Sequence, residues 1–211
     1  MKGEPRVTDR YTVLVVDPPW SYGSADRGIA QHAKGGSAEH HYETLGNNGK
    51  EVNRRTGAGV DSIIDATPIP ALTEQDAHLY LWTTNPKLPF AFRVMEAWGF
   101  VYKTTLTWVK TRRDGGVSGG GMGWFFRGAT EHVLFGVKGN KPIPAAIRRP
   151  NVVMAETTEH SAKPVEFYEM LRGLYPPDER MIDLYARRAH DRFDAWGNEA
   201  PSAENKGRTA P

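Results

Sequence analysis

The sequence predicts an α/β protein, in which helices cover the faces of a β-sheet. Two observations predict this class. The first is a series of short apolar runs typical of strands, at Thr12–Val16, His78–Thr83, Val101–Val109, His132–Val137 and Met181–Tyr185. The second is a pair of helical segments between these runs, at Leu88–Trp98 and Val165–Leu174. In sheets of this kind ligands bind beyond the carboxyl ends of the strands.

Each element has a local justification. The first run ends in consecutive aliphatic residues, Val13–Val16, which is typical of a buried strand. Val101–Val109 is less apolar, but it is rich in Thr, Val and Trp, which favour strands. The first helix ends at Gly99, whereas the second begins after Pro164 and ends before a pair of prolines.

Composition indicates a globular protein with one domain. The chain has 211 residues, of which 39% are hydrophobic, and a net charge of +2 from 27 Lys+Arg and 25 Asp+Glu. This charge is too small to require a nucleic-acid partner by itself. No apolar run approaches the roughly 20 residues of a membrane span. The charged start lacks the apolar stretch of a secretory signal, so we expect a cytoplasmic protein without a membrane partner. The absence of cysteine excludes disulfides, cysteine–zinc sites, iron–sulfur clusters and a cysteine nucleophile.

Three segments interrupt the pattern of strands and helices. Gly46–Thr67 is rich in Gly, Asn and charge, so we interpret it as a surface insertion in a domain that spans residues 1–200. Arg112–Gly123 has six glycines after a basic pair and precedes an aromatic run, so we expect a mobile loop with an aromatic, cationic base. Residues 201–211 are expected to form a disordered tail.

The strongest local signal is Asp17-Pro18-Pro19-Trp20, which directly follows the first strand. The end of the strand places Asp17 at the ligand edge of the sheet. Because proline lacks an N–H group and has a fixed φ, the carbonyls of Asp17 and Pro18 are held in one orientation. These acceptors beside an indole ring suit a planar group with an exocyclic amine, whose two N–H bonds need acceptors. A turn capped by an acid is the simpler interpretation of the same residues.

Further motifs follow in order along the chain. They are Tyr42–Leu45, Leu79–Asn85, Trp98–Phe100, Trp108–Thr111, Glu131–Gly139, His160–Pro164 and Trp196–Glu199. Together with the Asp-Pro-Pro-Trp signature, this series resembles the N6-adenosine-methyltransferase seventy-kilodalton-subunit family over nearly the whole chain. Members of that family are similar to permuted β-class DNA amino-methyltransferases. The resemblance implies a Rossmann-like fold with a mostly parallel sheet and methyl transfer from S-adenosylmethionine (SAM) to the N6 amine of adenine.

The resemblance also implies how the signature acts. Asp17 and the Pro18 carbonyl would accept the hydrogens of the amine, which makes its nitrogen a better nucleophile. Pro19 belongs to the same rigid segment, and Trp20 would stack on the base or line the pocket. Catalysis would then come mainly from positioning and preorganised electrostatics, with no metal required.

The cofactor residues are expected in the second half of the chain. Lys163 precedes the second helix, and a lysine beside a helix N-terminus makes a positive pocket for a carboxylate. The resemblance implies that this carboxylate belongs to the methionine of SAM; a solvated surface lysine is the alternative. Arg187, Asn198 and Glu199 match family residues that contact the cofactor ribose or its surroundings.

Candidate residues for nucleic acid surround the glycine-rich loop. Cations meet phosphates and aromatic rings stack on unpaired bases, which singles out Lys110, Arg112, Arg113, Trp124 and Arg127. A flexible loop there would close behind a flipped adenine. Tyr42 matches a family tyrosine near the target base, and Asn85 follows a strand; a buried aromatic and a turn-forming Asn are the alternatives. His40 and His41 are adjacent and lack further ligands, so no metal site is predicted.

The polymer and the oligomeric state stay open at this point. The compact length resembles bacterial or phage members of the family, so we expect DNA, with RNA as the alternative. A non-catalytic, nucleic-acid-binding partner of an active subunit is a further alternative, but such paralogues lack an intact Asp-Pro-Pro-Trp segment. Methyltransferases that act on cytosine or on protein glutamine typically carry Ser or Asn in place of Asp17. A homodimer and a heterodimer with a related subunit are both compatible with the sequence.

Overall fold

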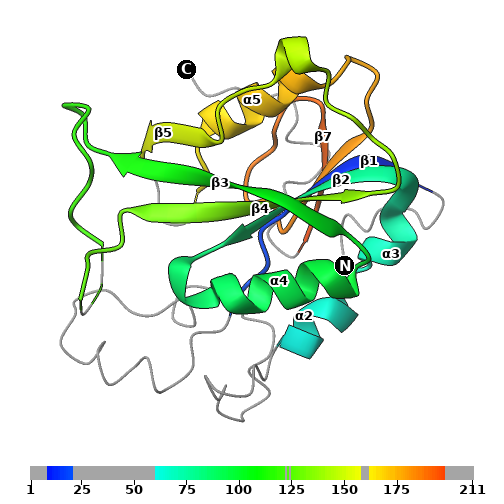
Figure 1. Cartoon of the computed structure of the whole chain (residues 1–211), viewed down its shortest axis with the longest axis horizontal. Helices are drawn as coiled ribbons and strands as arrows, with labels where there is room; N and C mark the ends of the chain where they lie inside the picture. The colour runs from blue at the N-terminus through cyan, green and yellow to red at the C-terminus, as the bar shows by residue number, and fades with distance from the viewer. Residues whose placement is uncertain (1–8, 21–59, 122, 124, 158–161, 198–211) are drawn as a thin grey trace.

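The computed structural model describes residues 9–20, 60–121, 123, 125–157 and 162–197. In this part of the chain, seven strands form one sheet in the order β5-β3-β4-β2-β1-β6-β7 (Figure 1). The strands are β1 (Tyr11–Val16), β2 (Thr73–Thr83), β3 (Val101–Thr111), β4 (Thr130–Lys138), β5 (Val152–Glu156), β6 (Met181–Leu184) and β7 (Phe193–Trp196). The α-helices are α2 (Val60–Ala66), α3 (Ile69–Leu72), α4 (Leu88–Ala97) and α5 (Val165–Leu174), and short 3-10 helices lie at η2 (Asn85–Lys87) and η3 (Ala145–Ile147).

The sheet is mixed, because β4 runs antiparallel to both of its neighbours while the other four pairings are parallel. Helices cover both faces: α2 and α4 lie against one face and α5 lies against the other (Figure 1). This arrangement confirms the predicted α/β, Rossmann-like class with a mostly parallel sheet. Among the described residues, no helix has the length and apolar character needed to cross a bilayer.

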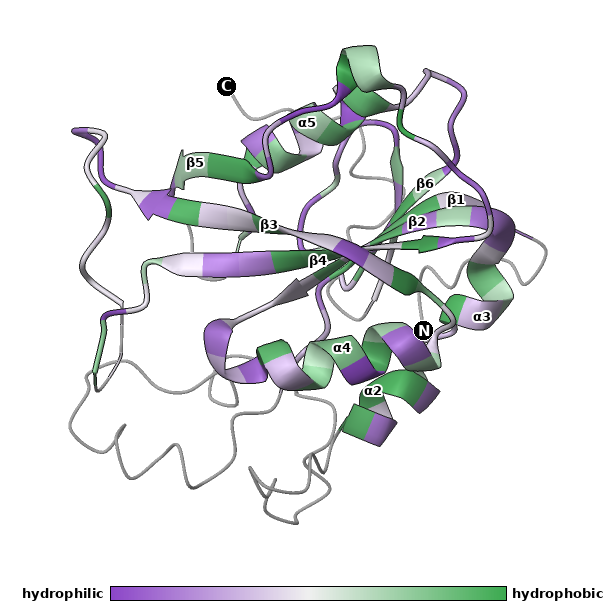
Figure 2. Ribbon diagram, in the orientation of Figure 1, coloured by the Kyte–Doolittle hydropathy of each residue, from purple (hydrophilic) through white to green (hydrophobic). Residues whose placement is uncertain are grey.

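Strand β1 divides its side chains between two cores, because successive residues of a strand point to opposite faces. Leu14 and Val16 pack with α2 and α4, whereas Val13 and Val15 pack with α5. All four side chains are fully buried, and the central strands are coloured as hydrophobic in Figure 2. Burial on both faces explains the continuous aliphatic run and fixes the position of the residue that follows β1.

The edge strands β5 and β7 are not predicted by the sequence analysis. Both are short, and β5 alternates exposed and buried residues. Their parallel pairing with β3 and β6, rather than their own composition, makes them strands. Strand β2 also begins earlier than predicted, at Thr73.

One correction concerns the segment interpreted as a surface insertion. Residues 46–59 lie outside the described part of the chain, but α2 occupies most of the rest, and its Val60 and Ile63 are buried against the core. Thr67 is fully buried, and its hydroxyl group lies 2.7 Å from that of Tyr185. The apolar face of α2 is only two residues wide, so the surrounding polar composition hides it.

The chain leaves the ends of β1 and β6 in opposite directions. These strands are parallel neighbours, but β1 leads toward β2 on one side and β6 leads to β7 on the other. Loops that diverge in this way leave a crevice beyond the strand ends, where open α/β sheets bind ligands. Asp17 follows β1 and Tyr185 follows β6, and both line a cleft at this crevice.

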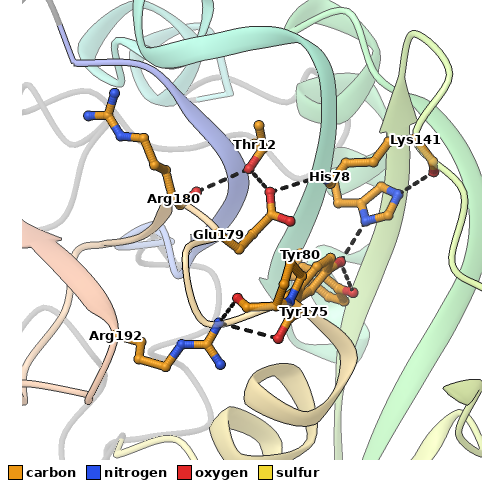
Figure 3. A network of polar contacts seen from close by, with 9 residues as sticks. Thr12, His78, Tyr80, Lys141, Tyr175, Glu179, Arg180 and Arg192 are labelled. Carbon is orange, nitrogen blue, oxygen red and sulfur yellow. Dashed lines mark hydrogen bonds and ion pairs between the residues drawn. The ribbon is translucent and has the colours of Figure 1, made fainter.

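The opposite edge of the sheet holds a buried polar network (Figure 3). His78 is fully buried, with Nε2 2.6 Å from the Lys141 carbonyl and Nδ1 2.5 Å from the Tyr175 hydroxyl, which lies 2.7 Å from the Tyr80 hydroxyl. A carbonyl only accepts, so a neutral His78 donates through Nε2 and accepts from Tyr175 at Nδ1. Tyr175 in turn accepts from Tyr80. Burial lowers the pKa of His78 to about 4, which keeps the ring neutral near pH 7.

Candidate active site

Four side chains of alternating charge lie beside the end of β1. The ammonium group of Lys163 lies 3.2 Å from Asp17 and 2.8 Å from Glu131, and the other carboxylate oxygen of Glu131 lies 2.6 Å from Lys110. These side chains are between 11% and 24% exposed, so solvent screens the contacts only in part. We call Asp17, Lys163, Glu131 and Lys110 the charged cluster.

Sheet topology brings the charged cluster together from distant parts of the chain. Asp17 follows β1, Lys110 lies near the end of β3, and Lys163 precedes α5. Glu131 lies near the start of β4. Because β4 is antiparallel, its start reaches the edge at which β2 and β3 end.

Two indole rings support the lysines of the cluster. Lys163 lies 4.9 Å from the ring centre of Trp82, and Lys110 lies 5.0 Å from that of Trp108. Cation–π attraction adds to the ion pairs at this range. Both tryptophans are almost fully buried, so they anchor the charged cluster to the hydrophobic core.

The two carboxyl groups of the cluster have opposite pKa shifts. Burial acts to raise the pKa of Glu131, but Lys163 and Lys110 outweigh it and lower that pKa to about 2. Burial raises the pKa of Asp17, and Lys163 opposes this only in part because the charge of Glu131 adds to the rise. Burial alone would lower the pKa of Lys163, but the two carboxylates raise it. Glu131 is therefore an anion near neutral pH, whereas the pKa of Asp17 lies above its ordinary value.

A cleft opens between Asp17 and the loop that follows β6. Its lining includes Asp17, Lys163, Tyr168, Asp183, Arg187 and His190. Asp183 is almost fully buried and accepts a 2.9 Å hydrogen bond from the Tyr168 hydroxyl, and burial raises the pKa of Asp183 to about 8. His190 stacks on Tyr168 with ring centres 3.4 Å apart. The cleft therefore combines cations, carboxyl groups and aromatic surface.

Hydrogen bonds fix the Asp-Pro-Pro-Trp segment. The backbone N–H of Asp17 donates to the carbonyl of the last residue of β6 at 3.2 Å, and that of Trp20 donates to the Pro18 carbonyl at 2.8 Å. Trp20 is buried, and its indole N–H donates to the Trp82 carbonyl at 3.0 Å. The Pro18 carbonyl therefore accepts a hydrogen bond within its own segment, and a carbonyl oxygen has two lone pairs.

The family profile that matches this chain is MT-A70, over residues 11–199. The chain belongs to the MT-A70 family. This membership confirms the resemblance drawn from the ordered motifs.

The chain is similar to proteins that it matches over most of their length and to others that it matches over a small part. The Type II methyltransferase M.MunI of Mycoplasma sp is 28% identical over 91% of this chain and 78% of its own length. A probable N(6)-adenosine-methyltransferase MT-A70-like protein of Oryza sativa subsp. japonica is 32% identical over 68% of this chain. The human N(6)-adenosine-methyltransferase catalytic subunit METTL3 is 28% identical over 86% of this chain. The aligned parts make up 20% and 26% of these two plant and human proteins, whereas they make up most of M.MunI.

The structure places Lys110 and Asn85 in different polar groups of this MT-A70 chain. Lys110 belongs to the charged cluster. The side-chain oxygen of Asn85 lies 2.8 Å from His132, and its amide donates to the Thr130 hydroxyl at 3.3 Å. Asn85 thus joins η2 to the start of β4, where its partners Thr130 and His132 flank Glu131.

The basic residues after β3 differ in their surroundings. Arg112 pairs with Asp114 at 3.1 Å and donates to the Val117 carbonyl at 3.1 Å, so it stabilises the turn after β3. Arg113 and Arg127 are exposed.

Several predicted site residues lie outside the described part of the chain. They are Tyr42, Trp124, Asn198 and Glu199. His40 and His41 also lie outside it, and among the described residues no group of three or more His, Cys, Asp or Glu is arranged to hold a metal. Arg187 lines the cleft, on the β6 side of Asp17.

Two site residues have no assigned role in the sequence analysis. Asp183 interrupts an apolar strand, Met-Ile-Asp-Leu, and an acid within a buried run is a usable local signal. Glu131 has no such signal, because its place beside Lys163 depends on the antiparallel direction of β4.

Proposed function

We propose that this protein transfers a methyl group from SAM to the N6 amine of an adenine in nucleic acid, with DNA as the favoured polymer. The class of enzyme, an N6-adenine methyltransferase, is confirmed by membership in the MT-A70 family together with the named relatives. The observation that carries the proposal is the position of Asp17, a carboxyl group at a strand end, between a buried lysine and a cleft.

The acceptors on the Asp-Pro-Pro-Trp segment match the needs of an aromatic amine. The lone pair of that amine is conjugated into the ring, so the nitrogen is a poor nucleophile until acceptors hold its two hydrogens. The Asp17 carboxylate supplies one acceptor, and the remaining lone pair of the Pro18 carbonyl supplies the other. Because both lie on one hydrogen-bonded segment that includes Pro19, they are in place before the adenine arrives. Asp17 need not be a strong base, since the methylated nitrogen loses its proton readily.

The residues of the cleft fit SAM, which would supply an electrophilic methyl group on a sulfonium. Lys163 has three N–H donors, and two of them face Asp17 and Glu131. We assign the third to the methionine carboxylate. Arg187 is a second cation of the cleft, and we assign it, with Asn198 and Glu199, to the ribose and its surroundings.

The remaining candidate residues are assigned to the nucleic acid. They are Tyr42, Asn85, Lys110, Arg112, Arg113, Trp124 and Arg127. The pair with Asp114 already offsets the charge of Arg112, so Arg113 and Arg127 are the stronger candidates for phosphates. Because Trp20 is buried and bonded to β2, we assign it to the wall of the pocket rather than to stacking on the base.

DNA is favoured over RNA because the chain aligns with most of M.MunI, a Type II methyltransferase. The specific observation that supports RNA is the similarity to proteins named as N(6)-adenosine-methyltransferases, METTL3 among them. METTL3 is named as a catalytic subunit, so we include in the proposal a heterodimer with a related subunit or a homodimer. We also propose a cytoplasmic location. The intact Asp17–Lys163 pair argues against a non-catalytic partner subunit.

The test is methyl transfer from labelled SAM to matched single- and double-stranded DNA and RNA oligonucleotides, with N6-methyladenine scored as the product. We expect incorporation into DNA that disappears in Asp17→Ala. Incorporation into RNA alone would reverse the choice of polymer. SAM binding without methylation of any polymer would overturn the proposal in favour of a partner subunit.

A further inference from the structure

The connection between β3 and β4 projects beyond the sheet (Figure 1). We call residues 112–129 the finger. At its base, the backbone N–H of Lys110 donates to the Ala129 carbonyl at 2.8 Å. The pair between Arg112 and Asp114 closes its first turn. The described parts of the finger are therefore held by specific contacts at the end nearest the sheet.

Glycines allow the two arms of the finger to approach each other closely. A Cβ at Gly121 would collide with the Gly128 carbonyl, and a Cβ at Gly123 would collide with the Phe126 carbonyl. Neither Gly121 nor Gly123 has a positive φ, so close approach of the backbones explains glycine at both positions.

Two adjacent phenylalanines follow the outgoing arm. Phe125 is 94% exposed and Phe126 is 89% exposed, the largest values among the large hydrophobic residues that the structure describes. Two neighbouring aromatic rings in water leave a large apolar area uncovered. An exposed apolar group of this size marks an interaction surface.

Charge indicates which kind of ligand covers these rings. Residues 112–129 contain three arginines and a single acid, Asp114, which pairs with Arg112. Arg113 and Arg127 are exposed. Aromatic rings among cations fit a nucleic acid, because bases stack on the rings and phosphates meet the arginines.

The finger begins and ends at the charged cluster. Lys110 precedes it and Glu131 follows it, and Lys163 joins Glu131 to Asp17. Four residues separate Phe126 from Glu131, and the five residue-to-residue steps span at most about 17 Å of extended chain. One base step along a strand is about 3.4 Å. The phenylalanines therefore lie within about five base steps of Glu131, which Lys163 joins to Asp17.

We propose that Phe125 and Phe126 form a wedge that inserts into duplex DNA beside the target adenine and keeps the base stack open. This inference rests on the proposed function for its substrate. Apolar side chains inserted between base steps unstack them, and an adenine must leave the duplex before Asp17 can reach its amine.

The test compares the double variant Phe125→Ala/Phe126→Ala with the unmodified protein on three DNAs of one sequence. These are the matched duplex, the same duplex with an abasic site opposite the target adenine, and the single strand. We expect kcat/KM to fall about 10- to 100-fold on the matched duplex and less than about threefold on the other two, where no pair must be opened. Phe92→Ala, a partly exposed phenylalanine on α4, is the matched control and should behave like the unmodified protein on every DNA.

A second measurement separates the wedge from the proposed activity. 2-Aminopurine in place of the target adenine brightens when it leaves the stack, so its fluorescence reports opening without chemistry. We expect the unmodified protein to raise this fluorescence and the double variant to leave it unchanged. If the protein opens the base but methylates nothing, the proposed function fails and the wedge stands.

Three results would overturn the wedge. One is equal loss on all three DNAs, and another is full activity of the double variant on the matched duplex. The third is a change in oligomeric state of the double variant in sedimentation velocity, which would make the rings a contact between chains.

Discussion

The two edges of the sheet hold their buried polar groups in different ways. At the carboxyl edge, Lys163 is shared between Asp17 and Glu131. At the amino edge, neutral groups donate in one direction from Tyr80 through Tyr175 to His78 (Figure 3). A shared cation can change partners when a ligand arrives, whereas a hydrogen-bonded chain with each donor matched to one acceptor has no second arrangement. A shared ion pair and a fixed chain of neutral hydrogen bonds therefore lie at opposite ends of the same sheet.

The largest expected effect is at the carboxyl edge. Asp17→Asn replaces an acceptor with an amide whose N–H groups compete with those of the adenine amine. We expect methyl transfer to fall about 10³-fold, with the melting temperature nearly unchanged because Lys163 keeps Glu131 as a partner. Methylation rates measure the loss of activity, and thermal unfolding measures the change in stability. If this variant loses activity because it unfolds, the carboxyl edge also contributes to stability and the two edges do not differ as stated.

The next effect tests whether Glu131 positions Lys163. Glu131→Gln removes the anion between two lysines, and we expect activity to fall about 10- to 100-fold. The charge of Glu131 raises the pKa of Asp17, so its removal should move the acid limb of the pH–activity profile to lower pH. A lower rate with an unmoved acid limb would show that Glu131 acts only through packing.

The amino edge should respond in stability and not in activity. Tyr175→Phe leaves the Nδ1 atom of His78 and the hydroxyl of Tyr80 without their partner. We expect the free energy of unfolding to fall by about 2 kcal/mol, measured by urea denaturation, with methylation unchanged. Tyr102→Phe is the control, because that exposed hydroxyl lies 2.9 Å from the Thr105 hydroxyl on the same strand; its effect should stay below about 0.5 kcal/mol. A loss of methylation activity in Tyr175→Phe would show that the polar network at the amino edge affects the site at the carboxyl edge.

The smallest effect, counted per pH unit, is a difference in the pH dependence of stability between the edges. The pKa of His78 is about 4 in the folded protein and 6.5 as its ordinary value. Between these values the unfolded chain binds a proton that the folded protein does not, so stability falls as the pH falls from about 6.5 to 4. Asp183 acts in the opposite sense, because its pKa rises from 3.8 to about 8 and stability falls as the pH rises through that window. Each slope is at most about 1.4 kcal/mol per pH unit.

Two variants separate these slopes. His78→Gln should lower the slope of unfolding free energy against pH below pH 6.5, where it no longer opposes the negative slope of Asp183. Asp183→Asn should remove that negative slope, which is best seen above pH 6.5. Urea denaturation between pH 4.5 and about 8.5 measures both. If both variants keep the parent slopes, neither group titrates as the burial of its side chain requires.

Local pattern was enough to predict part of the site. Val13–Val16 is apolar at every position because both faces of β1 are buried, and this identifies the strand that ends at Asp17. Local pattern did not predict the edge strands β5 and β7, because their pairing with β3 and β6 makes them strands. Helix α2 was also hidden from local pattern, because its buried residues Val60 and Ile63 lie in a segment of mostly polar composition.

The sequence by itself determined the α/β class, the acid at the end of β1 and membership in the MT-A70 family, because these depend on residues that are adjacent or ordered along the chain. Only the tertiary structure decided that Glu131 joins Lys163 to Lys110 and that Asp183 lines the cleft. It also decided why Gly121 and Gly123 are glycines. The physical reason is that an ion pair or a close backbone approach depends on strand direction and packing, which place residues far apart in sequence within a few ångströms of each other.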